Sequence, residues 1–218
     1  MRKLMIIILV AVLVLTGCAR EQTLAPQRDA TTVVTGEDAL ICLEYSRFSG
    51  AFPEDGTGRQ VASVAAILVK NDSAKFLDYA RIECAIGENR TGVFKVTGLP
   101  AGQCAWVLEQ SAMTIVEGEH FQAKPCTDYA FRSDVVTQTD KFDLQVDGNN
   151  VTVTNRSKET LENVCIYYKV LHEDGNYFGG ITYMLNFGTL SPGQATRKQS
   201  GYFGNSTRIV RYSFQTKA

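Results

Sequence analysis

The sequence lacks the features that mark a nucleic-acid binder or a common enzyme. Lys and Arg number 22 against 23 Asp and Glu, so the net charge is −1 and no basic excess exists to neutralise a phosphate backbone. It has only two histidines, and no G-x-S-x-G, H-E-x-x-H, S-x-x-K, Walker or C-x-x-C motif occurs. We therefore expect no nucleic-acid partner, no metal, no cofactor and no catalysis.

The first residues have the pattern of an export signal. Arg2 and Lys3 precede an unbroken run of twelve residues, Leu4 to Leu15, which are aliphatic apart from one methionine. A helix of that length spans about 18 Å, which is too short for the hydrocarbon core of a bilayer. We therefore interpret residues 1–17 as a signal peptide and not as a membrane span.

The signal ends in Leu15-Thr16-Gly17-Cys18, which resembles the lipobox of bacterial lipoproteins. The resemblance implies cleavage before Cys18 and a diacylglyceryl group on its sulfur, and two acyl chains suffice for stable anchoring. It implies a protein lipid-anchored to the cell membrane on the extracytoplasmic face, of the Gram-positive cell-surface type. The polar residues 19–36 are typical of a flexible linker, so we assign residues 18–36 to the lipidated cysteine and a tether.

Beyond the tether, no helical periodicity persists. Apolar and polar residues alternate in short runs separated by Gly, Asn, Asp and Pro, as is typical of strands and turns. The pattern predicts strands over Ala39–Tyr45, Val61–Lys70, Phe76–Ile86, Gly92–Thr97, Gln103–Glu109, Met113–Glu117, Lys141–Val146, Asn150–Thr154, Asn163–Leu171, Tyr177–Asn186, Ala195–Ser200 and Arg208–Phe214. The chain is therefore predicted to be all-β, with a strand spacing typical of β-sandwiches.

An internal repeat divides the chain. In residues 66–77 and again in 150–161, a strand runs into an Asn-x-Ser turn, at Asn71 and Asn155, and a leucine opens the next strand. Leu99 and Leu190 then occupy matching places before Pro/Gly turns. The alternation has the same phase in both copies and places Cys165 on the outward face. The repeat predicts tandem domains over residues 37–139 and 140–218.

This order of strands and turns is similar to the immunoglobulin-like modules of bacterial exported lipoproteins, including the FxLYD-type domains. Residues 150–200 are the most similar, although Tyr167-Tyr168 with Asp174 only loosely matches the FxLYD signature. The resemblance implies two tandem immunoglobulin-like β-sandwiches after the signal peptide and tether. It carries no catalytic residues.

Two groups of residues are candidates for a site. The longest irregular stretch within a domain, residues 46–60, contains Phe48 and Phe52, which either anchor a partner or fold back to cap the core. Cys84 and Cys104 both fall on phases that we interpret as inward. They form either an inter-sheet disulfide or two buried free thiols, and we favour the thiols.

We expect a non-catalytic binding or interaction module at the cell envelope. Its partners are the membrane, through the diacylglyceryl group on Cys18, and an envelope protein or glycan. One alternative is a solute-binding lipoprotein of a transporter, which a deep polar cleft between the domains would favour. Another is an exported hydrolase or thiol enzyme, which a cysteine within hydrogen-bond reach of a histidine would favour.

Overall fold

The computed structural model describes residues 27–54 and 56–217, and every regular element in that part of the chain is a β-strand. The signal peptide, Cys18 and the first part of the tether lie outside the described residues. The strands are β1 Thr31–Val34, β2 Leu40–Ala51, β3 Gln60–Asn71, β4 Phe76–Ile86, β5 Arg90–Leu99, β6 Cys104–Leu108, β7 Phe121–Ala123, β8 Asp128–Arg132, β9 Phe142–Asp147, β10 Asn150–Asn155, β11 Leu161–Val170, β12 Tyr177–Phe178, β13 Tyr183–Leu190, β14 Ala195–Gln199 and β15 Thr207–Thr216. The prediction of an all-β chain is confirmed.

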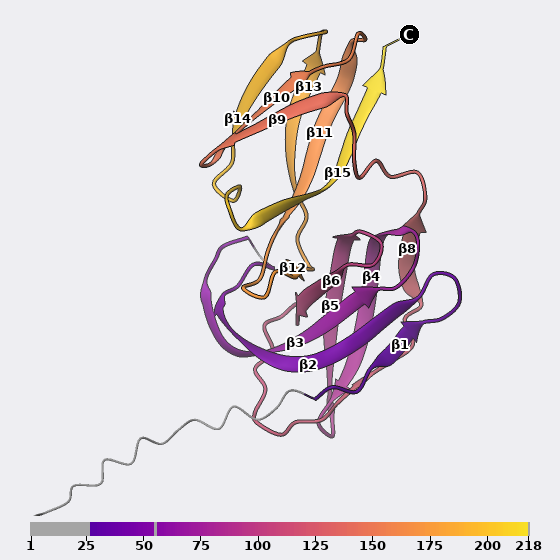
Figure 1. Ribbon diagram of the computed structural model, residues 1–218. Helices are drawn as coiled ribbons and strands as arrows, with labels where there is room; N and C mark the ends of the chain where they lie inside the picture. The colour runs from indigo at the N-terminus through magenta and orange to yellow at the C-terminus, as the bar shows by residue number, and fades with distance from the viewer. Residues whose placement is uncertain (1–26, 55, 218) are drawn as a thin grey trace, which may run out of the picture.

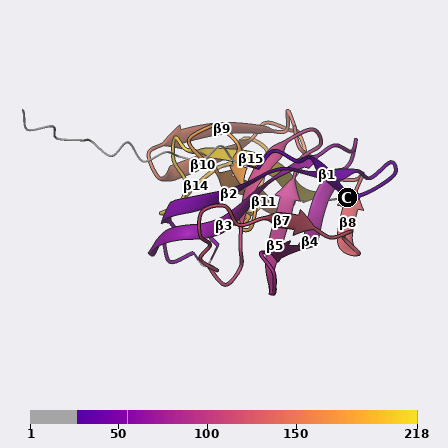
Figure 2. The same cartoon turned by 90° about the horizontal axis from the view of Figure 1, so that it is seen from below.

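Two sheets enclose the first core, and we call them the first body. One sheet has the order β1-β2-β3-β6-β12, and the other has the order β5-β4-β7 with β8 also paired to β4. Figure 2 shows β2 and β3 in one layer and β4, β5 and β7 in the other. Because side chains alternate along a strand, Ile67 and Val69 of β3 meet Ala80, Ile82 and Cys84 of β4, and all five are 0% exposed.

Two three-stranded sheets, β14-β10-β9 and β13-β11-β15, make up the second body. Val151 and Val153 of β10 share a separate core with Val164 and Ile166 of β11 and Leu190 of β13. Figure 1 shows the second body stacked on the first, with β12 lying beside β6 in the first body. The boundary between residues 139 and 140 stays a prediction.

The repeated Asn-x-Ser turn has the same hydrogen bonds in both bodies. Asn71 donates from Nδ2 to a carbonyl of its own turn and to the carbonyl of Leu99, the second at 2.9 Å. Asn155 donates likewise to its own turn and to the carbonyl of Leu190, also at 2.9 Å. In each turn the serine hydroxyl donates to the asparagine Oδ1. The predicted equivalence of Asn71 with Asn155 and of Leu99 with Leu190 is therefore confirmed.

The predicted flexible tether is wrong at its end. Thr31–Val34 form β1, which pairs antiparallel with β2, and Val33 and Val34 are each 3% exposed. Four consecutive β-branched residues favour a strand, and burying two valines stabilises it against the sheet. The polar residues on either side conceal this signal in the sequence.

Several predicted strands also differ from the observed ones. Residues 113–117 make only an isolated bridge, between Thr114 and Val64, and β7 and β8 were not predicted. The predicted strand over 177–186 is interrupted, so β12 joins the first body and β13 the second. A chain segment that passes between two bodies cannot be distinguished by periodicity from one that stays in a single sheet.

Cys165 is buried, although the alternation places it outward. It is 8% exposed, and its neighbours Val164 and Ile166 are both 0% exposed. The register of β11 shifts on both sides at this point, so three consecutive residues are buried. A bulge of this kind breaks the period of two on which the prediction depended.

Candidate functional site

A short segment of the chain that follows β11 completes the sheets of the first body. β12 pairs in parallel with β6, and Phe178 lies opposite Trp106. Gly179 donates its N–H to the Trp106 carbonyl at 2.7 Å and accepts the Thr97 N–H on its own carbonyl at 2.9 Å. Because Thr97 belongs to β5, Gly179 bonds to both sheets of the first body. Main-chain hydrogen bonds therefore join the two bodies.

Lys169 of β11 holds the same segment from the second body. It is 0% exposed, and its Nζ donates to the carbonyls of Phe178, Gly179 and Ile181 at 3.2, 2.8 and 2.8 Å. An ammonium has three N–H donors, and each finds an acceptor here. Burial lowers the pKa of Lys169 to about 7, whereas the carboxylate of Glu54 acts in the opposite direction. Lys169 thus fixes the turn that carries Phe178.

Two adjacent glycines allow this close passage of the chain. A Cβ atom on Gly179 would lie 2.6 Å from Cγ2 of Val107, and one on Gly180 would overlap the carboxylate of Glu54. No other residue type lets the backbone approach its neighbours this closely.

Trp106 is held in one orientation by a carboxylate from the turn between β11 and β12. Its indole Nε1 donates to Oδ2 of Asp174 at 2.7 Å. The backbone N–H of Asn176 donates to Asp174 Oδ1 at 2.9 Å, and Nδ1 of His172 lies 3.0 Å from the same oxygen. Burial raises the pKa of Asp174, but the hydrogen bonds from Trp106, Asn176 and His172 outweigh it and lower the pKa to about 2. The acceptor is therefore ionised at neutral pH, which strengthens its bond to the indole.

A hollow of about 130 Å³ opens beside Trp106. We call it the aromatic hollow and define it by its lining residues, Ser46, Arg47, Phe48, Ala66, Trp106, Leu108 and His172. It adjoins a wider hollow of about 360 Å³, which shares Arg47, Phe48 and His172 and extends to Glu173 and Phe178. Two segments that are distant in sequence, the second half of β2 and the turn at 172–178, therefore line two adjoining hollows.

The rings around this depression form a chain of contacts. Ring centroids are 5.8 Å apart for Trp106 and His172, 5.4 Å for His172 and Phe178, and 5.6 Å for Phe178 and Phe48. The last two pairs meet edge to face, as aromatic rings prefer. Aromatic walls with a few polar groups are the usual composition of a small-ligand site.

The structure separates the two predicted aromatic anchors. Residues 46–60, predicted as a loop, are largely strand, because β2 continues to Ala51, which pairs with Gln60 of β3. Phe52 is 1% exposed and packs in a third cluster on the outer face of the sheet, so it caps hydrophobic residues. Phe48 is half-buried and lines the aromatic hollow. The register shift between Phe48 and Gly50 interrupts the alternation that would have revealed the strand.

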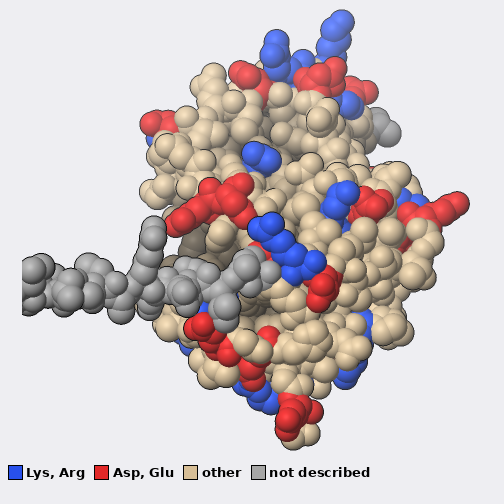
Figure 3. Space-filling model, turned by 60° about the horizontal axis from the view of Figure 1, so that its bottom comes forward, with Lys and Arg blue, Asp and Glu red and all other residues tan. Residues whose placement is uncertain are grey.

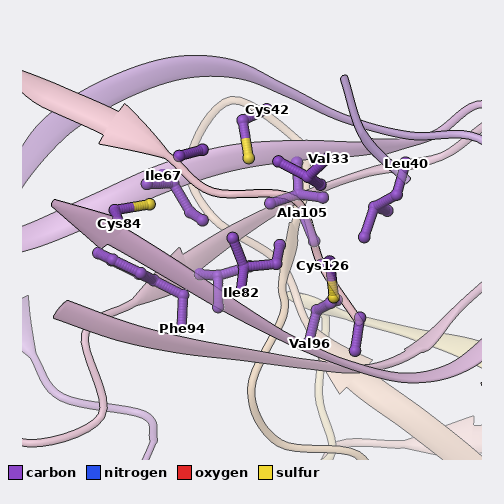
Figure 4. Close-up of a cluster of buried hydrophobic side chains, with 14 of the residues drawn as sticks. Val33, Leu40, Cys42, Ile67, Ile82, Cys84, Phe94, Val96, Ala105 and Cys126 are labelled. Atoms are coloured by element: carbon purple, nitrogen blue, oxygen red, sulfur yellow. The ribbon is translucent and has the colours of Figure 1, made fainter. Parts of the chain in front are cut away.

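Every cysteine in residues 27–54 and 56–217 is a free thiol, so no disulfide joins Cys84 to Cys104. Cys84 is 0% exposed and points into the first core, as do Cys42 and Cys126 (Figure 4). Burial raises the pKa of the Cys84 thiol to about 12. Cys104 lies on the other face of β6, because its neighbour Ala105 is the residue that enters the core. The inward phase predicted for Cys104 is therefore wrong.

The phase of β6 could not be assigned because both of its faces are covered. Ala105 and Val107 enter the first core, while Trp106 and Leu108 contact the third cluster, which contains Phe52. Apolar residues on both faces remove the contrast that tells the inside of a sheet from its outside.

The next observations concern the thiol-enzyme alternative, metal binding and membrane-spanning helices. The Cys126 thiol donates to the carbonyl of Arg81 at 3.2 Å, and burial raises its pKa. Within the described ranges no group of three or more His, Cys, Asp or Glu is placed to hold a metal ion. No helix long and apolar enough to cross a membrane occurs in the same ranges.

A second depression, of about 490 Å³, lies between the first body, the connecting residues 133–138 and β15. Its two cations already have neighbours: Arg132 bonds Asp134 at 3.0 and 2.8 Å, and Arg208 lies 5.8 Å from the ring centre of Tyr177. We call it the interbody cleft. It is one of the depressions in the described residues that are lined by both bodies, as the cleft of the solute-binding alternative would be.

The charged surface is mixed. Figure 3 shows basic and acidic side chains interspersed on one face of the molecule, separated by broad areas without charge. Many charged side chains of the described residues are paired, such as Lys141 with Glu159 at 2.9 Å and Arg90 with Glu119. Such a face concentrates neither sign of charge, so it offers no field to attract a polyanion.

Sequence reasoning missed three residues of the junction, Lys169, Trp106 and Asp174. Asp174 was considered only as part of a loose match to the FxLYD signature. The adjacent glycines at 179 and 180, inside an otherwise strand-like run, were the available signal, because paired glycines in a strand indicate close backbone approach.

Comparison with known proteins gives no relative from which a function could be carried over. No protein-family model matches the chain, and no curated protein matches it. The function therefore has to be inferred from the residues and their geometry.

Proposed function

We propose that this protein is an exported lipoprotein, anchored through a diacylglyceryl group on Cys18 at the extracytoplasmic face of the cell membrane. The observation that carries the proposal is Leu15-Thr16-Gly17-Cys18 directly after the charged and apolar leader. Nine residue steps separate Cys18 from Gln27. A chain of that length reaches at most about 30 Å, so the folded part stays close to the bilayer.

The fold that we propose for the two bodies is a pair of tandem immunoglobulin-like β-sandwiches similar to FxLYD-type modules. The matching hydrogen bonds of Asn71 and Asn155 support a duplicated unit, because each asparagine ties its own turn to the neighbouring strand in the same way. The predicted domains, residues 37–139 and 140–218, are retained in this proposal.

The biochemical role that we propose is binding without catalysis, with a glycan or an envelope protein as partner. The aromatic hollow supports this role, because Trp106 is fixed by Asp174 and lies beside other rings at an open surface. The net charge of −1 makes a nucleic acid an unsuitable partner.

Replacement of the lipidated cysteine tests the anchoring. We expect the wild-type protein in the membrane fraction with incorporated palmitate, and Cys18→Ala either released or retaining its leader. Cys165→Ala is the matched control, because Cys165 is buried and should keep both the palmitate and the membrane association. Palmitate labelling of Cys18→Ala at the wild-type level would overturn the proposal.

A solute-binding lipoprotein of a transporter is the second candidate, and the interbody cleft is the observation that favours it. Closing such a cleft on a solute requires the two bodies to move. The bonds of Lys169 and Gly179 across the junction oppose that motion. Thermal stabilisation by a small carboxylate or phosphate that is lost in Arg208→Ala would favour this candidate over the first.

A further inference from the structure

We infer that the aromatic hollow binds one pyranose ring of a neutral oligosaccharide. The inference rests on the proposed function, because it names the ligand class of the same binding module. Three observations support it: the fixed indole, the charge balance of the rim and the second hollow that shares lining residues with the first.

The fixed indole provides a surface for stacking. Because Asp174 already accepts the N–H of Trp106, a ligand meets the face of this ring and not its polar edge. The apolar face of a pyranose carries several C–H bonds, which pack favourably against an electron-rich ring. The orientation is set before the ligand arrives, so binding does not have to immobilise the side chain.

The rim of the depression favours a neutral ligand rich in hydroxyl groups. Arg47 and Glu173 line it and are both exposed, and neither side chain has a hydrogen bond or ion pair with any other described residue. The guanidinium of Arg47 only donates hydrogen bonds, and the ionised carboxylate of Glu173 only accepts them. Together they can bond a pair of neighbouring hydroxyl groups. Their charges cancel, which disfavours a strongly ionic ligand. An apolar peptide side chain would offer neither group a hydrogen-bond partner, whereas sugar hydroxyls offer one to each.

The dimensions favour a sugar within a chain. The aromatic hollow, at about 130 Å³, is small, but it adjoins the 360 Å³ hollow that carries Glu173 and shares Arg47, Phe48 and His172 with it. A ring seated on Trp106 can therefore be followed by further sugar units along β2 and the turn at 172–178.

The fluorescence of Trp106 gives a direct test, because the chain contains one tryptophan. The detergent-solubilised full-length protein would be titrated with cellotetraose and with the tetramer of N-acetylglucosamine. We expect a saturable change in emission with at least one of them. Arg47→Ala and Glu173→Ala should each weaken the affinity about tenfold. Tyr129→Ala is the matched control, since Tyr129 is an exposed aromatic residue on β8, outside the hollow.

Two outcomes would overturn the inference. One is an emission that neither sugar changes at millimolar concentration. The other is an affinity for the sugars, or for an apolar peptide tested in their place, that is the same in wild type, Arg47→Ala and Glu173→Ala. The proposed function is judged separately: if purified cell envelopes retain wild type and Arg47→Ala equally, the module binds elsewhere and only this inference fails. If the wild-type protein binds the sugar but carries no palmitate, the membrane anchor is rejected and this inference stands.

Discussion

Lys169 should make the protein more stable as the pH rises from 7 to 9. Burial lowers its pKa to about 7 from an ordinary value of 10.5. Between these two values the unfolded chain binds a proton that the folded protein has released, so the free energy of unfolding rises with pH. The slope approaches about 1.4 kcal/mol per pH unit, and it is half of that at pH 7. From pH 7 to 9 the gain from this lysine is about 2 kcal/mol.

Urea unfolding of wild type and Lys169→Met at both pH values measures this effect. Buried cysteines act in the opposite direction, because their raised pKa values reduce stability as the unfolded thiols ionise toward pH 9. The cysteines are the same in both proteins, so the difference between the two pH dependences isolates the lysine. We expect wild type to gain about 2 kcal/mol relative to the variant.

Equal pH dependence of wild type and Lys169→Met would refute this reasoning. It would mean that the three carbonyls and the Glu54 carboxylate stabilise the ammonium enough to cancel the effect of burial on the pKa of Lys169. Lower stability of Lys169→Met at every pH is expected in addition, because methionine leaves three carbonyls without their donor.

Three further predictions concern the repeat, the junction and the thiols. Asn155→Ala should lower the free energy of unfolding in urea by roughly 2–4 kcal/mol, since it removes two buried donors; a loss below about 0.5 kcal/mol would contradict this. Gly179→Val should expel the inserted segment and shift the Trp106 emission to longer wavelength, whereas an unchanged spectrum would show that the junction tolerates a side chain. A thiol reagent should label Cys104 first in the native protein, because Cys84 is 0% exposed; faster labelling of Cys84, located by peptide mass, would contradict the burial described.

Strands of the two cores such as β4 could be predicted because only one of their faces is apolar. Ala80, Ile82 and Cys84 alternate with polar residues and are all 0% exposed, as their period indicates. The asparagine of each repeat was also recognisable, because the Asn and Ser side chains of an Asn-x-Ser turn form hydrogen bonds with backbone groups a few residues away in the sequence.

The junction between the bodies could not be predicted from the same patterns. The burial of Lys169 depends on three carbonyls from residues 178–181, and nothing in the sequence of β11 specifies that contact. Tyr177 and Phe178 have the alternation of an ordinary strand, but they join a sheet whose other strands precede them by many residues. Periodicity reports which face of a strand is apolar, whereas the identity of the covering segment depends on tertiary packing.

The most direct test of the proposed lipid-anchored binding module is the mass of the N-terminal peptide of the protein extracted from membranes. The account predicts that this peptide begins at Cys18 and carries a diacylglyceryl group on its sulfur. A mature N-terminus at any other residue, or an unmodified Cys18, would contradict it.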